Sequence, residues 1–252
     1  MTKIISITNQ KGGVGKTTTC CALISGLSSM GNKVLGVDLD PQGNLGFSLG
    51  IDIENGLTIY DILKGDVNAG EAIRHTDYGD VIPSNILLSS AELEFNRSGR
   101  EFMLQNALEP IKGDYDYIII DTPPALNILT VNAYVTSNSL IIPMVPEVLS
   151  LLGISQLKDT IQIVRKFYNR DLKILGVLLV KYNKQLNLVK EVEDLTAAIA
   201  EQLETSIFDT KIRNSIAVAE APAHGQSVLT YAPKANAAID FSGLIKEICA
   251  KL

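Results

Sequence analysis

Apolar runs rich in isoleucine, valine and leucine recur along this chain of 252 residues without a regular alternation of polar positions. This pattern is typical of strands that are buried on both faces, as in a parallel sheet covered by helices. The pattern predicts strands at 3–8, 33–38, 115–121, 138–143 and 173–180, and weaker strands at 80–83 and near 205–209.

Segments with apolar residues at helical spacing separate these runs. They predict helices at about 17–30, 58–64, 90–108, 126–136, 151–168, 187–203 and 235–251. Strands that alternate with helices predict an α/β fold, with a mostly parallel, twisted sheet and helices on both faces. No repeat, low-complexity tract or long linker interrupts the alternation, so we expect one domain over residues 1–252. Ligands of such sheets bind at the carboxyl ends of the strands.

A glycine-rich stretch follows the first predicted strand and leads directly into the first predicted helix. It reads Gln10-Lys11-Gly12-Gly13-Val14-Gly15-Lys16-Thr17-Thr18. Glycines let successive backbone N–H groups turn towards a bound anion, and the helix N-terminus adds its positive dipole. In this arrangement Lys16 can reach the β- and γ-phosphates, and the Thr17 hydroxyl can coordinate Mg²⁺. We therefore predict an ATP site over residues 12–18, with a glycine- and lysine-rich surface turn as the alternative.

The glycine-rich stretch departs from the ordinary P-loop at one position. The first glycine of G-x-x-x-x-G-K-[ST] would fall at Gln10, whereas a second lysine, Lys11, lies inside the loop. This is the deviant Walker A motif, K-G-G-x-G-K-T. Three further segments match the same family, at 37–44 (VDLDPQGN), 118–124 (IIIDTPP) and 219–225 (AEAPAHG). With these motifs in this order, the chain resembles the ParA/MinD family of P-loop ATPases over nearly its whole length, and especially the short, Soj-type partition ATPases.

The resemblance implies hydrolysis of ATP to ADP and phosphate, with Mg²⁺ as the cofactor. Asp121 ends a strongly apolar strand, the Walker B position, where a carboxylate typically holds Mg²⁺ directly or through water. A helix N-cap is the alternative for Asp121. By the resemblance, Asp40 positions or polarises the attacking water and Asp38 supports the metal and the loop, although both could be solvated turn residues. We expect Thr17, Asp38 and Asp121 at the metal.

The resemblance implies a catalytic role for Lys11. A lysine at this position cannot easily fold back into its own phosphate site. In the family it reaches across a dimer interface to the γ-phosphate of the partner subunit, where a cation stabilises the charge that develops in phosphoryl transfer. The resemblance therefore implies a homodimer around two ATP molecules, with Lys11, Lys16 and Asp40 as catalytic residues. A surface lysine without a role in the partner subunit is the alternative.

The adenine contacts are harder to place. In the family the base lies between the end of a late strand and a following loop, which correspond here to 180–183 and 212–222. The resemblance therefore points to Asn183 and Pro222 as ATP-binding residues. An asparagine after a strand is equally a turn residue.

Soj-type proteins bind DNA without sequence preference, through phosphate contacts of lysines and arginines. On this chain the resemblance points to Lys181, Lys184, Lys211 and Arg213. These residues are scattered and the formal net charge is −6, so the chain has no basic domain in the usual sense. A dimer can still double a weak patch on one face. Ordinary solvated lysines are the alternative.

Composition bears on the compartment and on other cofactors. No apolar run approaches the roughly 18 residues that span a bilayer, and the glycine-rich loop interrupts any signal peptide. We therefore expect a cytoplasmic protein without stable membrane insertion. The apolar stripe of the last helix, at 239–252, is expected to pack against the sheet. Cys20, Cys21 and Cys249 give no pair for an iron–sulfur cluster between subunits and are expected to be buried thiols.

The resemblance as a whole implies an ATP-dependent dimerising switch for plasmid or chromosome partition. A ParB-like centromere-binding protein would stimulate hydrolysis, and the ATP-bound form would associate with the nucleoid. One alternative is a MinD-like or pole-localised ATPase that positions a cargo other than DNA. Another is an ATP-dependent amidoligase or synthase, which would need a pocket for a second substrate.

Overall fold

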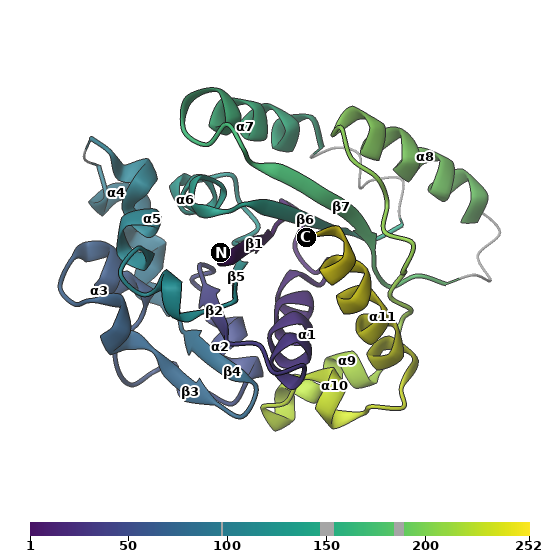
Figure 1. The fold of residues 1–252 in the computed structure, drawn as a ribbon, viewed down its shortest axis with the longest axis horizontal. Helices are drawn as coiled ribbons and strands as arrows, with labels where there is room; N and C mark the ends of the chain where they lie inside the picture. The colour runs from purple at the N-terminus through teal and green to yellow at the C-terminus, as the bar shows by residue number, and fades with distance from the viewer. Residues whose placement is uncertain (97, 147–153, 184–188) are drawn as a thin grey trace.

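A computed structural model describes residues 1–96, 98–146, 154–183 and 189–252. Among them, seven strands form one central sheet (Figure 1). The strands are β1 (Lys3–Ile7), β2 (Val34–Asp38), β3 (Arg74–Thr76), β4 (Gly79–Ile82), β5 (Tyr117–Asp121), β6 (Ser139–Met144) and β7 (Lys173–Leu179). The order is β3-β4-β2-β5-β1-β6-β7, and only β3 and β4 pair antiparallel. The predicted α/β fold with a mostly parallel sheet is confirmed.

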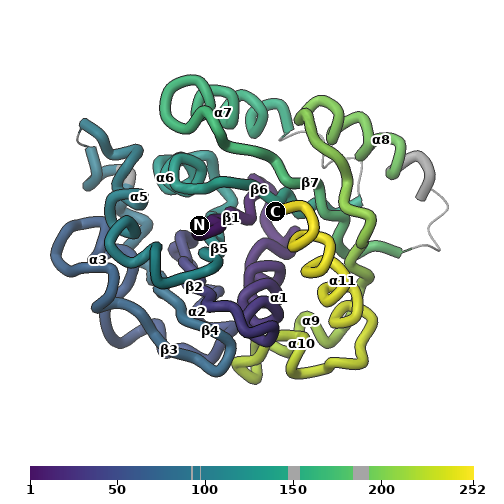
Figure 2. The backbone as a smooth tube through the Cα atoms, viewed as in Figure 1, coloured from purple at the N-terminus to yellow at the C-terminus, as the bar shows by residue number. Residues whose placement is uncertain are grey.

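Helices cover both faces of this sheet (Figure 1). One face carries α3 (Ile59–Lys64), α5 (Met103–Leu108), α6 (Ile128–Thr136), α7 (Ile154–Phe167) and α8 (Val189–Gln202). The other face carries α1 (Lys16–Ser29) and α11 (Asn236–Lys251), which lie side by side (Figure 2). The described chain also has four short α-helices, α2 (Asn44–Ser48), α4 (Ala91–Glu94), α9 (Ala217–Glu220) and α10 (Val228–Tyr231), and several short 3₁₀ helices.

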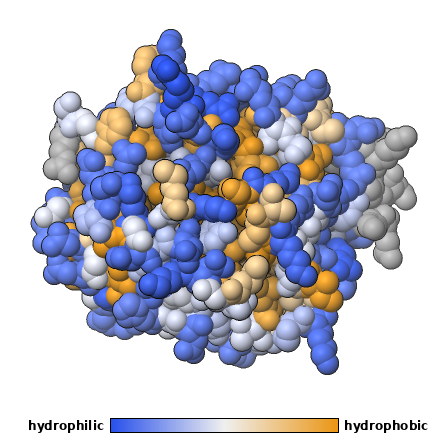
Figure 3. Space-filling model, viewed as in Figure 1, coloured by the Kyte–Doolittle hydropathy of each residue, from blue (hydrophilic) through white to orange (hydrophobic). Residues whose placement is uncertain are grey.

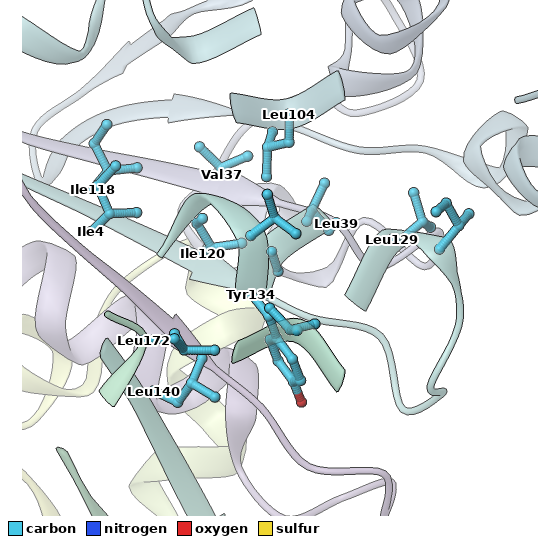
Figure 4. Close-up of a cluster of buried hydrophobic side chains, with 14 of the residues drawn as sticks. Ile4, Val37, Leu39, Leu104, Ile118, Ile120, Leu129, Tyr134, Leu140 and Leu172 are labelled. Atoms are coloured by element: carbon cyan, nitrogen blue, oxygen red, sulfur yellow. The ribbon is translucent and has the colours of Figure 1, made fainter. Parts of the chain in front are cut away.

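An apolar cluster fills each interface between the sheet and its helices. Figure 4 shows part of one cluster, where Ile118 of β5 lies beside Ile4 of β1 and Ile120 lies near Tyr134 of α6. The Tyr134 hydroxyl is buried and shares a hydrogen bond of 2.7 Å with Thr8 Oγ1, so its polar atom is satisfied. Helices cover both faces of these strands, so apolar residues occupy successive positions along them.

The last helix packs inward, as predicted. On α11, Phe241, Leu244, Ile245 and Ile248 are buried in the cluster shared with α1, whereas Ile239 is exposed. Cys20 and Cys21 are also buried there, while Cys249 is only partly buried.

The edge strand β3 is absent from the sequence prediction. It pairs antiparallel with β4 across a tight turn, in which Thr76 Oγ1 donates to the Gly79 carbonyl at 2.7 Å. None of its three residues, at 74–76, is buried, so no apolar pattern marks the strand.

Two other predicted elements are shorter than expected. The segment near 205–209 forms a single parallel bridge to β7, Val177 with Ile207. The Val177 N–H donates to the Ser206 carbonyl, and the Phe208 N–H donates to the Val177 carbonyl. The helix predicted at 90–108 is broken into α4 and α5. Gly99 lies between them at a φ of 79°, in the left-handed region, where a continuous helix is interrupted.

The face in Figure 3 is mostly hydrophilic, with apolar residues in separate small areas. Among the described residues, no helix combines the length and the apolar character that crossing a bilayer requires.

Candidate nucleotide site

The glycine-rich loop joins β1 to α1 at the carboxyl edge of the sheet. Gly13 and Gly15 have φ angles of 72° and 77°, in the left-handed region that other residues rarely adopt. Gly15 directly precedes α1, so the free N–H groups at the start of that helix lie at the loop. On the neighbouring strands β2 and β5, Asp38 and Asp121 pair in register at the same edge. The topology thus brings the loop and both aspartates together.

Lys16 is a buried cation in this loop. The residue is only 7% exposed, and its Nζ donates to the Lys11 carbonyl at 3.2 Å. Burial lowers the pKa of Lys16, while the charges of Asp121 and Asp40 oppose that shift. A cation beside a helix N-terminus suits the binding of phosphate groups.

Thr17 and Asp121 offer oxygens that fit a Mg²⁺ ion. The Thr17 hydroxyl donates to Asp121 Oδ2 at 2.6 Å, and Asp121 Oδ1 is buried without a hydrogen-bond partner among the described residues. Burial raises the pKa of Asp121 to about 7, although the Thr17 hydrogen bond and the Lys16 charge act in the other direction. In the part of the chain that the structure describes, no three His, Cys, Asp or Glu residues form a metal cluster. Mg²⁺ is compatible with so few protein ligands, because it retains waters and binds substrate phosphates.

Asp38 is held in another way. Its Oδ1 accepts the Asp40 N–H and its Oδ2 accepts the Leu45 N–H, each at 3.0 Å, in a fully buried setting. Burial, with the nearby charge of Asp121, raises the pKa of Asp38, and the two backbone hydrogen bonds oppose that shift. With both oxygens bonded to the backbone, Asp38 is suited to fixing loop 40–45 more than to contacting a metal directly.

A cavity of about 650 Å³ lies beside the loop, within the range of small-ligand sites. Part of its wall is polar and comes from the glycine-rich loop and the ends of β2 and β5, namely Gly12, Gly13, Gly15, Lys16, Thr17, Thr18, Asp40, Gln42, Asn44 and Pro124. The rest comes from the end of β7, the following loops, α9 and α11, namely Val180, Lys181, Ile212, Arg213, Asn214, Ser215, Val218, Ala219 and Phe241. The second set contains the apolar side chains that suit a nucleobase.

Several predicted ATP residues lie elsewhere. Neither Asn183 nor Pro222 lines the cavity, and Val14 is buried in the core beneath the loop. The cavity is also lined by Gln42 and Phe241, which were not predicted as site residues, and by Val218, which lies in the segment 212–222 expected near the base. The signal for Gln42 was its place in the motif at 37–44, whereas Phe241 was hidden in the apolar stripe of the last helix.

The three predicted DNA contacts within the described residues do not form one open basic patch. Lys211 forms an ion pair with Glu193, and Arg213 forms one with Asp240 at 2.7 Å. Lys181 is exposed but lines the nucleotide cavity. Lys184 lies outside the described residues.

Comparison with known proteins identifies the family. A family model described as an AAA domain matches residues 2–174. The chain is 42% identical to the sporulation initiation inhibitor protein Soj of Bacillus subtilis, with 99% of each chain covered. The chain belongs to the ParA/MinD family of P-loop ATPases.

Two further proteins show a similar match over nearly the whole chain. The chain is 39% identical to the chromosome partitioning protein ParA of Myxococcus xanthus, covering 98% of this chain and 87% of that protein. Among solved structures, cobyrinic acid a,c-diamide synthase of Mycobacterium smegmatis, with bound ADP and magnesium, matches with a TM-score of 0.86 and 35% identity. That match covers 98% of this chain and 93% of the synthase.

In this ParA/MinD-family chain, Lys11 of the deviant Walker A motif directly precedes the first glycine of the loop. Lys11 is partly buried, and its N–H donates to Asn9 Oδ1 at 2.9 Å. Asn9 is in turn tied to the Pro143 carbonyl through its side-chain amide at 2.7 Å. These bonds fix the backbone at Lys11, while a role of its side chain in a partner subunit stays a prediction.

Proposed function

We propose that this chain is an ATP-dependent dimerising switch that partitions a plasmid or chromosome region. The observation that carries the proposal is the Thr17–Asp121 pair beside Lys16 at a nucleotide-sized cavity. The similarity to Soj and ParA over nearly the full length of this chain supports partition as the process.

Each residue of the site has a role in the proposed hydrolysis of ATP. The loop N–H groups and Lys16 bind the β- and γ-phosphates, and Thr17 and Asp121 hold Mg²⁺. When bound, Mg²⁺ neutralises negative charge on the phosphates. Asp40, which lines the cavity and accepts the Gln42 N–H at 3.0 Å, orients the attacking water.

Assembly is the proposed output of ATP binding. Lys11 reaches the γ-phosphate in the partner subunit, so two subunits associate around two ATP molecules and separate after hydrolysis. The ATP-bound dimer binds DNA without sequence preference and associates with the nucleoid. A ParB-like centromere-binding protein stimulates hydrolysis and so releases the dimer from DNA.

Three of the four predicted DNA contacts have other neighbours in the structure. Lys211 and Arg213 are engaged by carboxylates, and Lys181 borders the nucleotide. We therefore assign Lys184 as the first phosphate contact to test. Two copies of a sparse patch act together in a dimer, so DNA affinity should depend on ATP.

An amidoligase is the enzymatic alternative, favoured by the similarity to the diamide synthase. Such an enzyme must hold an acceptor carboxylate next to the γ-phosphate. A second cavity of about 490 Å³ is lined by residues 49–52, 55, 74–78 and 224–226. Among the described residues, none lines both this cavity and the nucleotide cavity. This separation favours the partition switch.

A gel-shift series with non-specific duplex DNA tests the proposal. We expect binding by the wild type with ATP and none with ADP. Between about 50 and 200 mM salt, a plot of log affinity against log salt concentration should have a slope of roughly −0.9 per neutralised phosphate. Lys184→Glu should weaken binding, while Lys173→Glu, at an exposed lysine that begins β7, should have little effect. If ATP-bound wild type does not bind DNA even at the lowest salt, the positioning alternative is preferred over partition.

A further inference from the structure

The loop 212–215, which lines the nucleotide cavity, is tied to α11 by one carboxylate. The Arg213 N–H donates to Asp240 Oδ2 at 2.9 Å. The Arg213 guanidinium reaches the same carboxylate, with Nε 2.9 Å from Oδ2 and Nη2 2.7 Å from Oδ1. One aspartate therefore holds both the backbone and the side chain of Arg213.

We call the part of the cavity lined by the end of β7, residues 212–219 and α11 its base end, and the part lined by the glycine-rich loop its phosphate end. The Arg213–Asp240 contact lies at the base end. The side chain of Asp240 is 13% exposed, so little water competes for its oxygens. The next residue, Phe241, lines the cavity, as do Ile212 and Asn214 on either side of Arg213. Hydrogen bonds to a charged group are stronger than neutral ones, and a fork-shaped pair also fixes orientation. Asp240 thus sets the spacing between two walls of the base end.

We infer that Asp240 is a positioning residue for the nucleoside part of ATP. This inference rests on the proposed binding of ATP at this site. Through Arg213 it holds 212–215 against α11, so that the apolar base end is already formed before the nucleotide arrives. The phosphate end is built by other segments and does not depend on this contact. The same contact engages the guanidinium of Arg213, so in our proposal Arg213 is not the first residue expected to contact DNA.

The helix α11 supplies a matched control in Glu247. Its two oxygens accept the N–H groups of Asp209 and Thr210, at 2.9 and 3.0 Å. Glu247 thus shares with Asp240 the helix and a carboxylate that accepts backbone N–H groups, while its ion pair is with Lys251, at 3.9 Å. Asp209 and Thr210 do not line the nucleotide cavity, so Glu247 ties down a segment that has no part in the site.

Asp240→Asn and Glu247→Gln separate positioning from general stability. Each keeps the size of the side chain but removes the charge and one acceptor oxygen. Competition against a fluorescent ATP analogue gives the affinities for Mg-ATP and for Mg-tripolyphosphate, which has neither base nor ribose. We expect Asp240→Asn to weaken ATP binding roughly tenfold, about the effect of one charged hydrogen bond, and to leave the affinity for tripolyphosphate unchanged. The KM for ATP should rise equally, with kcat unchanged.

The other outcomes overturn the inference. Equal losses for ATP and tripolyphosphate in Asp240→Asn would mean that the substitution disturbs the whole site. An equal loss of ATP affinity in Glu247→Gln would mean that any weakening of α11 has this effect. Unchanged ATP affinity in Asp240→Asn would remove the positioning role while leaving the proposed function intact. A wild type that binds tripolyphosphate but not ATP would overturn both.

Discussion

Asp38 and Asp121 occupy paired positions on neighbouring strands, yet their partners differ. Both oxygens of Asp38 accept backbone N–H groups, whereas one oxygen of Asp121 is bonded to Thr17 and the other is buried without a partner among the described residues. A buried carboxylate oxygen without a hydrogen bond is costly unless a ligand satisfies it. In our proposal Asp121 therefore faces the metal and Asp38 fixes the loop that carries Asp40.

Lys16→Ala tests the phosphate end directly. We expect ATP affinity to fall by ~100-fold or more, because the variant loses the buried cation that binds the β- and γ-phosphates. Titration with a labelled ATP analogue measures this. Lys173→Ala, at an exposed lysine of β7, should bind ATP like the wild type. Undiminished affinity of Lys16→Ala would contradict the assignment of the phosphate site.

The phosphate end could be predicted from the sequence because its residues are contiguous. Glycines at fixed spacing, followed by Lys16 and Thr17, describe the loop almost completely. The base end was expected only through the resemblance, at 180–183 and 212–222, and that expectation left out Phe241. Val180, Ile212 and Phe241 come from three separate segments, and only tertiary packing brings them to one cavity.

At the scale of elements, two glycine turns contact each other: one follows α2, and the other ends the 3₁₀ helix at Ala221–His224. Gly225 caps that helix at a φ of 62°, and Gly50 follows α2 at a φ of 78°. A Cβ on Gly225 would lie 2.8 Å from Gly50 Cα and 3.2 Å from Gly50 N, which are backbone atoms that no rotamer change can move. The contact links the loop region of Asp40, through α2, to the segment before α10.

Gly225→Ala should therefore destabilise the fold, by about 1–3 kcal/mol from the left-handed backbone alone and more from the backbone clash. Thermal unfolding measures the loss. Gly65→Ala is the matched control, since Gly65 also has a left-handed φ, 91°, but its Cβ would meet no atom within 4 Å. Equal destabilisation by the two substitutions would mean that the close contact between Gly225 and Gly50 adds nothing to the stability lost.

Elements with long apolar runs, such as β5 and β6, were predicted because burial on both faces leaves a clear pattern. β3 was missed since its polar residues owe their strand conformation to a turn and to pairing with β4. The helix at 90–108 was overextended because apolar periodicity continues across Gly99, where the backbone does not.

At the scale of the whole molecule, helices cover both faces of the sheet (Figure 1). The nucleotide cavity lies at the carboxyl edge of that sheet. The formal net charge of −6 opposes binding to nucleic acid by a single subunit. DNA affinity in our account therefore depends on assembly, which brings two local patches to one face. ATP-controlled dimerisation is the claim on which the other steps depend.

Light scattering of the protein with Mg²⁺ and either ATP or ADP tests that claim most directly. We expect the wild type to have the monomer mass of 27.2 kDa with ADP and to shift towards twice that mass with ATP. Asp40→Ala should accumulate the ATP-bound dimer, because it binds ATP but hydrolyses it poorly. Lys11→Ala should bind ATP yet keep the monomer mass, because it lacks the cation offered to the partner subunit. Equal masses of the wild type with ATP and ADP, or an ATP-dependent dimer of Lys11→Ala like that of the wild type, would contradict the account.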